Sequence, residues 1–158
     1  MDVLMDGMDV LQNALGRLQK VAREPEAILR DIGIIVEGTS KKSFGNQKAP
    51  DIVADVTDGK AQEAAGASWA ELAEVTVKRR RNKKKGSIRI LQDMGDLKLS
   101  INSRVNEDSV TIGSGLQYGK WHQGGTKRMP ARPFIGYNTA DEQRFINIVL
   151  KHIEAACK

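Results

Sequence analysis

Few side chains in this sequence could carry out catalytic or metal chemistry. The 158 residues include two histidines, His122 and His152, and one cysteine, Cys157. A single histidine lacks the further ligands that zinc requires, and the sequence has no pair of cysteines. It also contains no H-E-x-x-H, G-x-S-x-G, G-x-G-x-x-G or P-loop pattern. Scattered residues can still form a catalytic triad in a fold, but we predict a protein that is not an enzyme and that binds no cofactor or metal. We expect His152 to be a packed histidine beside the apolar stripe of a C-terminal helix.

A run of basic residues accounts for the positive net charge. Seven of the 25 lysine and arginine residues lie between positions 78 and 85, which leaves 18 against 20 acidic residues elsewhere. These seven are Lys78, Arg79, Arg80, Arg81, Lys83, Lys84 and Lys85. If all of them contacted phosphates, the log–log salt slope on duplex DNA would be at most about −6. The run is therefore either a solvated loop or a contact, without sequence specificity, to DNA or to an acidic partner.

A segment rich in glycine and proline occupies residues 118–137 and has the sequence YGKWHQGGTKRMPARPFIGY. Gly124 and Gly125 permit positive φ, whereas Pro130 and Pro133 fix φ. These restrictions predict a rigid, irregular connector on the surface, where contacts with partners usually lie. An ordinary packed turn ahead of a final helix would have the same composition, so both interpretations stay open. Residues 118–137 are called the connector below.

Three polar side chains could hold the connector in one shape. His122 and Gln123 can hydrogen-bond to neighbouring backbone groups. Arg132 can make a bidentate bond to a carboxylate. That carboxylate could belong to Asp141 or Glu142 of the same chain, or to another subunit.

Hydrophobic periodicity predicts three helices at the two ends of the chain. Apolar residues at helical spacing favour amphipathic helices over residues 9–22 and 27–44, interrupted at Pro25. The same spacing predicts a C-terminal helix that is capped by Thr139, with Glu142 as its capping-box partner. The helices at the two ends should pack against each other or against a partner.

The middle of the chain begins with a long loop or insertion. Residues 45–68 have no sustained periodicity and are interrupted by proline and glycine. Ser68 is a good N-cap, and Glu71 three residues later completes a capping box. We therefore predict a helix that includes Trp69 and runs into the basic stretch.

A β-hairpin is the tertiary unit that the sequence predicts most directly. Leu97, Leu99 and Ile101 alternate at strand period, and a second alternating segment follows the turn residues 106–109. The hairpin should extend from about residue 98 to 113. The order of helices, hairpin and final helix predicts an α+β domain. We expect one domain over 1–158, composed of a helical part (9–44), a loop or insertion (45–68) and an α+β core (69–158).

Composition narrows the class of protein. Apolar residues make up 40% of the chain and charged residues 28%, which is typical of a globular domain. Aromatic residues are only 4%, so we expect aliphatic residues to build the core. No apolar run approaches membrane-spanning length, and the N-terminal residues are acidic where a secretory signal would be basic. With a single cysteine, the chain fits a reducing cytoplasm.

Several motifs in the second half of the chain resemble one family. They are the segments Ile90-Leu91-Gln92-x-x-Gly95-x-Leu97, Val110-x-Ile112-Gly113, Tyr118-x-x-x-His122-Gln123-x-Gly125 and Met129-Pro130-Ala131-Arg132-Pro133-Phe134. In this order they resemble the phage virion morphogenesis family, the Mu G-like tail-completion and head-tail joining proteins. The resemblance runs from about Trp69 to the C-terminal helix. Gly124 departs from it, because such proteins often carry a bulky apolar residue there.

The resemblance implies a structural role in virion assembly at the head-tail junction or tail end, with assembly in the host cytoplasm. A ring of identical subunits would fit that role, and its partners would be other neck or tail proteins. A ring requires two different patches that meet head to tail. The connector would form one patch together with the hairpin, and the N-terminal helices would form another. The connector residues that we assign to this interface are Tyr118, Trp121, His122, Gln123, Gly125, Met129, Pro130, Arg132, Pro133 and Phe134.

Overall fold

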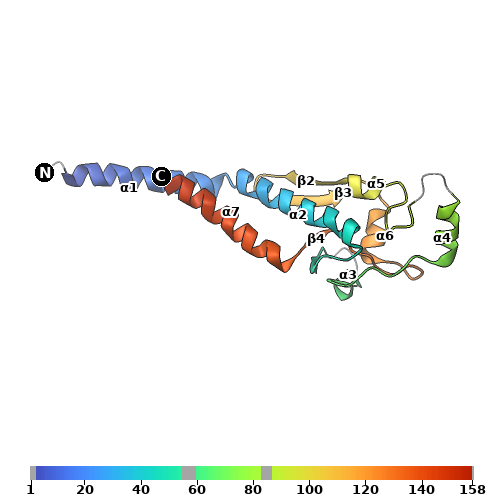
Figure 1. Cartoon of the computed structure of the whole chain (residues 1–158). Helices are drawn as coiled ribbons and strands as arrows, with labels where there is room; N and C mark the ends of the chain where they lie inside the picture. The colour runs from blue at the N-terminus through green and yellow to red at the C-terminus, as the bar shows by residue number, and fades with distance from the viewer. Residues whose placement is uncertain (1–2, 55–59, 83–86, 158) are drawn as a thin grey trace.

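The computed structural model of the chain describes residues 3–54, 60–82 and 87–157. Figure 1 shows the elements in chain order. They are α1 (Val3–Arg23), α2 (Glu26–Asn46), β1 (Ile52–Val53), α3 (Lys60–Glu63), α4 (Glu74–Arg81), α5 (Asp96–Leu99), β2 (Ile101–Val105), β3 (Val110–Ser114), α6 (Gly119–Gly124), β4 (Gly136–Tyr137) and α7 (Thr139–Cys157). The fold is α+β, as the sequence predicts.

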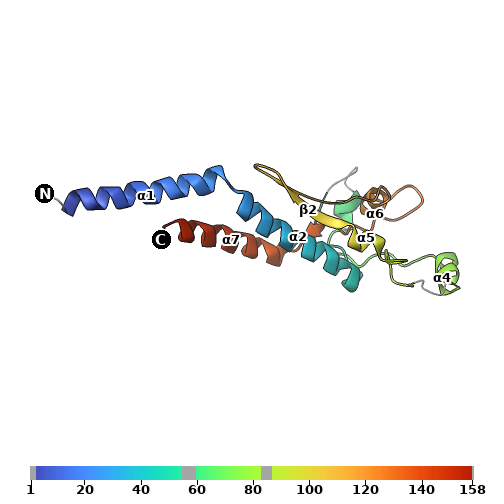
Figure 2. The ribbon, with the colours of Figure 1, turned by 90° about the horizontal axis from the view of Figure 1, so that it is seen from above.

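The three long helices form one end of the molecule. The break between α1 and α2 falls at the predicted Pro25. α2 packs against α7 on one side and against the β2–β3 hairpin on the other, while α1 packs against α7. The first turns of α1 extend past the end of α7 as a single helix (Figures 1 and 2). Within the described residues, no helix combines the length and the apolar character needed to cross a membrane.

The first turn of α7 shows one difference from the prediction. The helix begins at Thr139, as expected, but its capping carboxylate is Asp141 and not Glu142. The buried Asp141 Oδ2 accepts the N–H of Asn138 at 3.0 Å and the hydroxyl of Thr39 on α2 at 2.8 Å. The cap therefore also joins α7 to α2.

The predicted hairpin is present as the antiparallel pair β2–β3, with Ile101 opposite Ser114 and Val105 opposite Val110. Its first strand is shorter than predicted. Leu97 and Leu99 lie in the one-turn helix α5, where Leu97 is buried and Leu99 is 78% exposed. Apolar residues at every second position, over only Leu97, Leu99 and Ile101, were therefore too short a pattern to predict a strand.

The segment between α2 and α4 is largely irregular, as predicted for residues 45–68. Its only described regular elements are α3 and β1, and β1 pairs with β4 from the far end of the connector. That pairing requires glycine at position 136, because a Cβ there would lie 2.1 Å from the carbonyl oxygen of Ile52. The segment thus fixes the end of the connector.

The predicted helix that runs into the basic stretch is present as α4, but its predicted start at Ser68 is wrong. Residues 68–73 are not helical, and α4 begins at Glu74. Trp69 is buried instead, and its indole N–H donates to the carbonyl of Pro133 at 2.9 Å. This hydrogen bond and the packing of the indole ring outweigh the local capping signal.

The centre of the core is aromatic, contrary to the expectation of an aliphatic core. The Phe44 ring meets the rings of Trp69 and Phe134 edge-on, each at 5.5 Å between centroids. Aliphatic side chains such as Leu97 and Ile101 surround this trio. A low aromatic content therefore did not prevent three of the seven aromatic residues from gathering at one point.

Candidate functional site

The connector starts as a helix and not as irregular chain. Its residues Gly119–Gly124 form α6, which presents Tyr118 at its start and Trp121 in its middle. Tyr118 is 38% exposed and Trp121 is 50% exposed. Lys120 lies over the Trp121 ring at 5.6 Å. Two aromatic side chains on one short helix therefore face solvent.

Gln123, the last side chain of α6, is almost fully buried and fixes the rest of the connector. Its Nε2 donates to the carbonyls of Ala54 at 3.0 Å and Ile135 at 3.1 Å. Its Oε1 accepts the N–H groups of Phe134 at 2.9 Å and Ile135 at 3.0 Å. The prediction that Gln123 would lock the backbone is thus confirmed, and the bonds reach both ends of the connector and the β1 segment.

His122 takes part in the same lock through its backbone. Its carbonyl accepts the N–H of Arg132 at 2.7 Å. The side chain does not make the predicted backbone bond, since its buried Nδ1 has no hydrogen-bond partner among the described residues. Burial, followed by the charges of Arg132 and Arg80, holds the pKa of His122 below its ordinary value, so the imidazole is neutral at pH 7.

Arg132 does not bind Asp141 or Glu142, the two carboxylates of the same chain that the sequence suggests as its partners. Its Nε and one terminal nitrogen each donate at 2.8 Å, to the carbonyls of Ala70 and Glu71 respectively. The guanidinium therefore holds the irregular chain ahead of α4 against the connector. These acceptors could not be predicted from the sequence, because every residue has a backbone carbonyl and the residue type does not show which carbonyl will accept a hydrogen bond.

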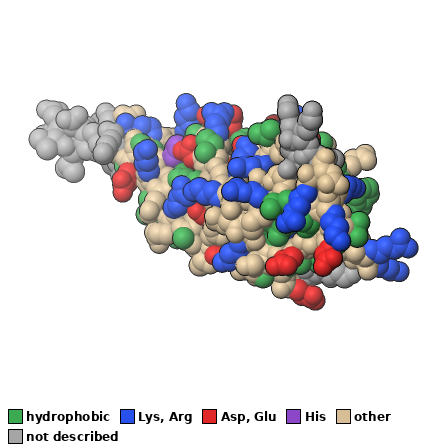
Figure 3. Space-filling view, turned by 45° about the vertical axis from the view of Figure 1, so that its right-hand side comes forward, with side chains coloured by type: hydrophobic (Ala, Val, Ile, Leu, Met, Phe, Trp, Pro, Cys, Tyr) green, Lys and Arg blue, Asp and Glu red, His purple; other side chains and the backbone are tan. Residues whose placement is uncertain are grey.

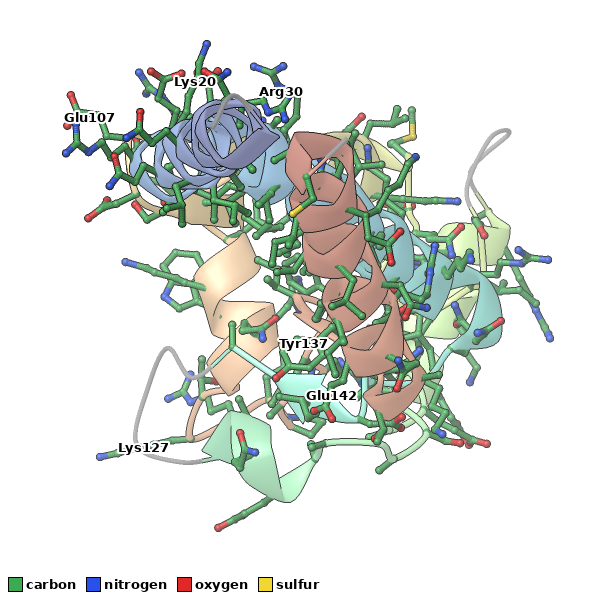
Figure 4. All side chains as sticks on the ribbon, turned by 90° about the vertical axis from the view of Figure 1, so that its left-hand side faces the viewer. Lys20, Arg30, Glu107, Lys127, Tyr137 and Glu142 are labelled. Carbon is green, nitrogen blue, oxygen red and sulfur yellow. The ribbon has the colours of Figure 1, made fainter. Side chains whose placement is uncertain are left out.

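The turn after α6 depends on one glycine of the predicted pair. Gly125 has φ +70°, and a Cβ on it would lie 2.7 Å from the nitrogen of Ala131. Gly124 is buried at the end of α6 and does not adopt the positive φ that a glycine permits. A tight turn follows in which Thr126 and Met129 exchange backbone hydrogen bonds. Figure 4 shows Lys127 of this turn pointing away from the body, whereas Tyr137 at the other end of the connector lies against α7.

Burial divides the ten connector residues that we assigned to an interface. Gln123, Arg132, Pro133 and Phe134 are buried; His122, Gly125 and Met129 are partly buried; Tyr118, Trp121 and Pro130 are exposed. In a single chain the buried members hold the shape of the connector, and only the others are accessible to a partner.

The basic run is divided in the same way. Lys78, Arg79 and Arg81 are exposed on α4, while Arg80 is 9% exposed and turned inward. Lys83, Lys84 and Lys85 lie outside the described residues. Figure 3 shows lysine and arginine side chains spread among apolar and acidic ones over the face that it presents.

A polar cavity of about 260 Å³ lies beside α6 and was not predicted from the sequence. Arg80, His122 and Arg132 line it together with Asp93 and Tyr118. Arg80 donates to the carbonyls of Ser87 and Arg89 and lies 3.8 Å from Asp93. The only hint in the sequence was an arginine within a charged run, which does not distinguish a buried arginine from an exposed one.

Within the described residues, no group of three or more histidine, cysteine or acidic side chains is arranged to hold a metal ion. His152 is partly buried on α7, with Nε2 at 3.3 Å from Asp31 of α2. It is a packed histidine between two helices, as expected.

The fold is α+β, with a connector fixed by internal hydrogen bonds, and the chain belongs to the phage virion morphogenesis family, whose model matches residues 58–154. The resemblance that the connector motifs suggest is thereby confirmed. Over 156 aligned residues the chain is 31% identical to the "Putative capsid assembly protein G" of Escherichia phage Mu, an alignment that covers 94% of this chain and 91% of that protein. No solved structure matches it. The chain therefore has a structural role in virion assembly.

Proposed function

We propose that this chain is a tail-completion or head-tail joining (neck) component that works as a ring of identical subunits and is not an enzyme. The proposal places it in the virion at the head-tail junction or tail end, after assembly in the host cytoplasm. The proposal rests on one observation, namely that Tyr118 and Trp121 are exposed on α6. The hydrogen bonds of the buried Gln123 hold this helix in place. Exposed aromatic side chains on a rigid base are typical of the anchors that dominate protein interfaces.

The second patch that a ring requires lies at the helical end. Leu15 of α1 is 51% exposed, and Ile146 and Leu150 of α7 are 52% and 49% exposed. The helices α1 and α7 that carry these side chains lie toward the end of the ribbon from which α1 projects, away from α6 (Figure 2). Contact between the α6 patch of one subunit and the α1–α7 patch of the next would be heterologous, as a closed ring demands.

Truncation of the exposed aromatic residue tests the proposal. We expect Trp121→Ala to weaken subunit association by about tenfold or more, because an interface anchor is worth more than 1 kcal/mol. Leu99→Ala is the matched control, since Leu99 is also large, apolar and exposed but lies on α5. Native mass spectrometry of the purified proteins and electron microscopy of particles complemented with each variant would measure the effect. A wild-type chain that stays monomeric and is absent from virions would refute the proposal.

A nucleic-acid contact through α4 is the second candidate function. α4 lies at the end of the molecule opposite α1 (Figure 1), and three of its cations, Lys78, Arg79 and Arg81, are exposed. The burial of Arg80 leaves fewer cations for phosphates than the sequence suggests. Replacing the three exposed cations by serine should reduce the salt slope of DNA binding by about 3 if all of them contact phosphates. An unchanged slope and unchanged particle assembly would make them a solvated surface.

A further inference from the structure

The cavity beside α6 has an unusual charge balance. Arg132 is 6% exposed, and its Nε and one terminal nitrogen donate to the carbonyls of Ala70 and Glu71. Carbonyl oxygens satisfy hydrogen bonds but do not neutralise a charge. No ion pair of Arg132 is found among the described residues, and burial, followed by the charge of Arg80, lowers its pKa. Asp93 lies 3.8 Å from Arg80 and Asp96 also lines the cavity, so Arg132 is a buried cation that has acidic groups in the same cavity but no directly paired carboxylate within the described residues.

A second polar group in the cavity also lacks a partner. The Nδ1 of His122 is buried and makes no hydrogen bond within the described residues. Leaving such a group unpaired costs about 1–3 kcal/mol. In the described part of the chain, the Arg132 guanidinium has no directly paired carboxylate and the His122 Nδ1 has no hydrogen-bond partner, and both line one cavity. An anionic ligand in this cavity could form an ion pair with the first and a hydrogen bond with the second.

The walls of the cavity restrict the kind of anion. Leu72, Leu91 and Leu97 line it, so an apolar stem would be favoured beside the charged group. Asp93 and Asp96 also line it and would repel a polyanion such as a nucleic-acid backbone. Leu91 has φ +59°, a conformation that is strained for a branched side chain and that occurs chiefly at functional sites. A single carboxylate on a short hydrocarbon stem fits these features.

We propose that this cavity binds the carboxylate of an acidic side chain or chain terminus presented by a neighbouring protein in the virion. The inference rests on the proposed function, because Tyr118 both lines the cavity and belongs to the exposed aromatic pair. A chain that docks on α6 therefore lies next to the opening. The carboxylate would pair with Arg132, which the fold has already buried and oriented.

The binding step can be measured on the full chain without any partner. Sodium propionate supplies a carboxylate on a short stem, and inorganic phosphate at constant ionic strength is the comparison anion. We expect propionate to produce saturable NMR shifts of the His122 ring and the Arg132 Nε–H, and to bind more tightly than phosphate. No saturable shift, or tighter binding of phosphate, would overturn the proposal.

A pair of charge variants tests the location of the site. Met94 lines the cavity and is 62% exposed, so Met94→Glu adds a competing carboxylate there without disturbing the core. Leu99→Glu adds the same charge at an exposed position that does not line the cavity. We expect Met94→Glu to weaken propionate binding by about tenfold and Leu99→Glu to leave it within about twofold. Equal effects of the two variants would refute the assignment.

The source of the carboxylate is tested in assembled particles. A photo-crosslinking residue in place of Met94 should link to a segment of another protein chain that contains an aspartate, a glutamate or a C-terminus. The mapped position tells a side-chain carboxylate from a terminal one, while a crosslink to DNA would refute a protein source. If Trp121→Ala impairs assembly but propionate does not bind, the carboxylate proposal fails alone. If propionate binds but Trp121→Ala leaves assembly intact, the proposed function fails, and the inference of a neighbouring chain fails with it.

Discussion

Truncation of Gln123 to alanine is the sharpest test of how the connector is held. The side chain is 1% exposed and makes four hydrogen bonds to backbone groups. Alanine removes the partner of the Phe134 and Ile135 N–H groups and of the Ala54 carbonyl. The Ile135 carbonyl keeps a bond from the N–H of Ala54 at 3.0 Å. Three backbone groups, of which one is buried and two are partly buried, therefore lose their partner.

The size of the effect follows from those three groups. Each buried group left without a partner costs about 1–3 kcal/mol, and water that enters the vacated space recovers part of the loss. We therefore expect Gln123→Ala to lower the free energy of unfolding by about 3–6 kcal/mol. In a chain of this length each kcal/mol corresponds to about 2–4 °C, so Tm should fall by about 6–24 °C.

Urea and thermal unfolding, followed by far-UV circular dichroism, would measure this loss. Gln143→Ala is the matched control, because Gln143 is exposed on α7 and hydrogen-bonds only to the side chain of Asn147. The control should stay within about 0.5 kcal/mol of wild type. A Gln123→Ala variant that is also within about 1 kcal/mol of wild type would show that these four bonds do not hold the connector.

Two further predictions concern the pH dependence and the turn. Burial raises the pKa of Asp141, but hydrogen bonds from Asn138 and Thr39 and the pairing with Arg144 lower it overall. A lowered pKa stabilises the fold above the ordinary carboxyl value and is lost as the pH falls below about 4. The free-energy difference between wild type and Asp141→Asn should therefore be largest near neutral pH and shrink in acid; a constant difference in urea titrations would contradict this. Gly125→Ala should cost about 1–3 kcal/mol in the same assay, because φ is positive and the new Cβ would meet Ala131. Gly115→Ala, where no atom lies within 4 Å, should be near neutral and is the control.

The elements that the sequence predicted correctly are those with a long periodic signal. The helices 9–22 and 27–44 lie within α1 and α2, and the C-terminal helix begins at the predicted Thr139. Each of these stretches repeats its apolar spacing over several turns, so a single misleading residue does not change the result. The hairpin was found for a similar reason, since turn residues separate two alternating segments.

The predictions that failed rested on short signals that tertiary contacts override. Ser68 and Glu71 have the residue types of a good capping box, yet the core offered Trp69 an edge-on contact with the Phe44 ring and a carbonyl acceptor, which together are worth more than a cap. Asp141 and Glu142 were the partners suggested for Arg132 within the chain, but its guanidinium bonds to the carbonyls of residues 70 and 71 instead. Both errors have one cause, namely that the sequence does not show which distant segment a side chain will meet.

The same contacts explain why a mostly buried connector suits an assembly protein. Docking costs less entropy when the docking groups are already ordered. Tyr118 and Trp121 stand on a helix whose last side chain, Gln123, is bonded to two separate backbone segments, at residue 54 and at residues 134–135, so their backbone is fixed before any partner arrives. It follows that Gln123→Ala should weaken assembly although Gln123 touches no partner, and that it should also lower Tm. Trp121→Ala should weaken assembly alone, because a half-exposed ring contributes little to the core. If Gln123→Ala lowers both Tm and assembly whereas Trp121→Ala lowers assembly alone, Gln123 stabilises the connector and Trp121 contacts the partner.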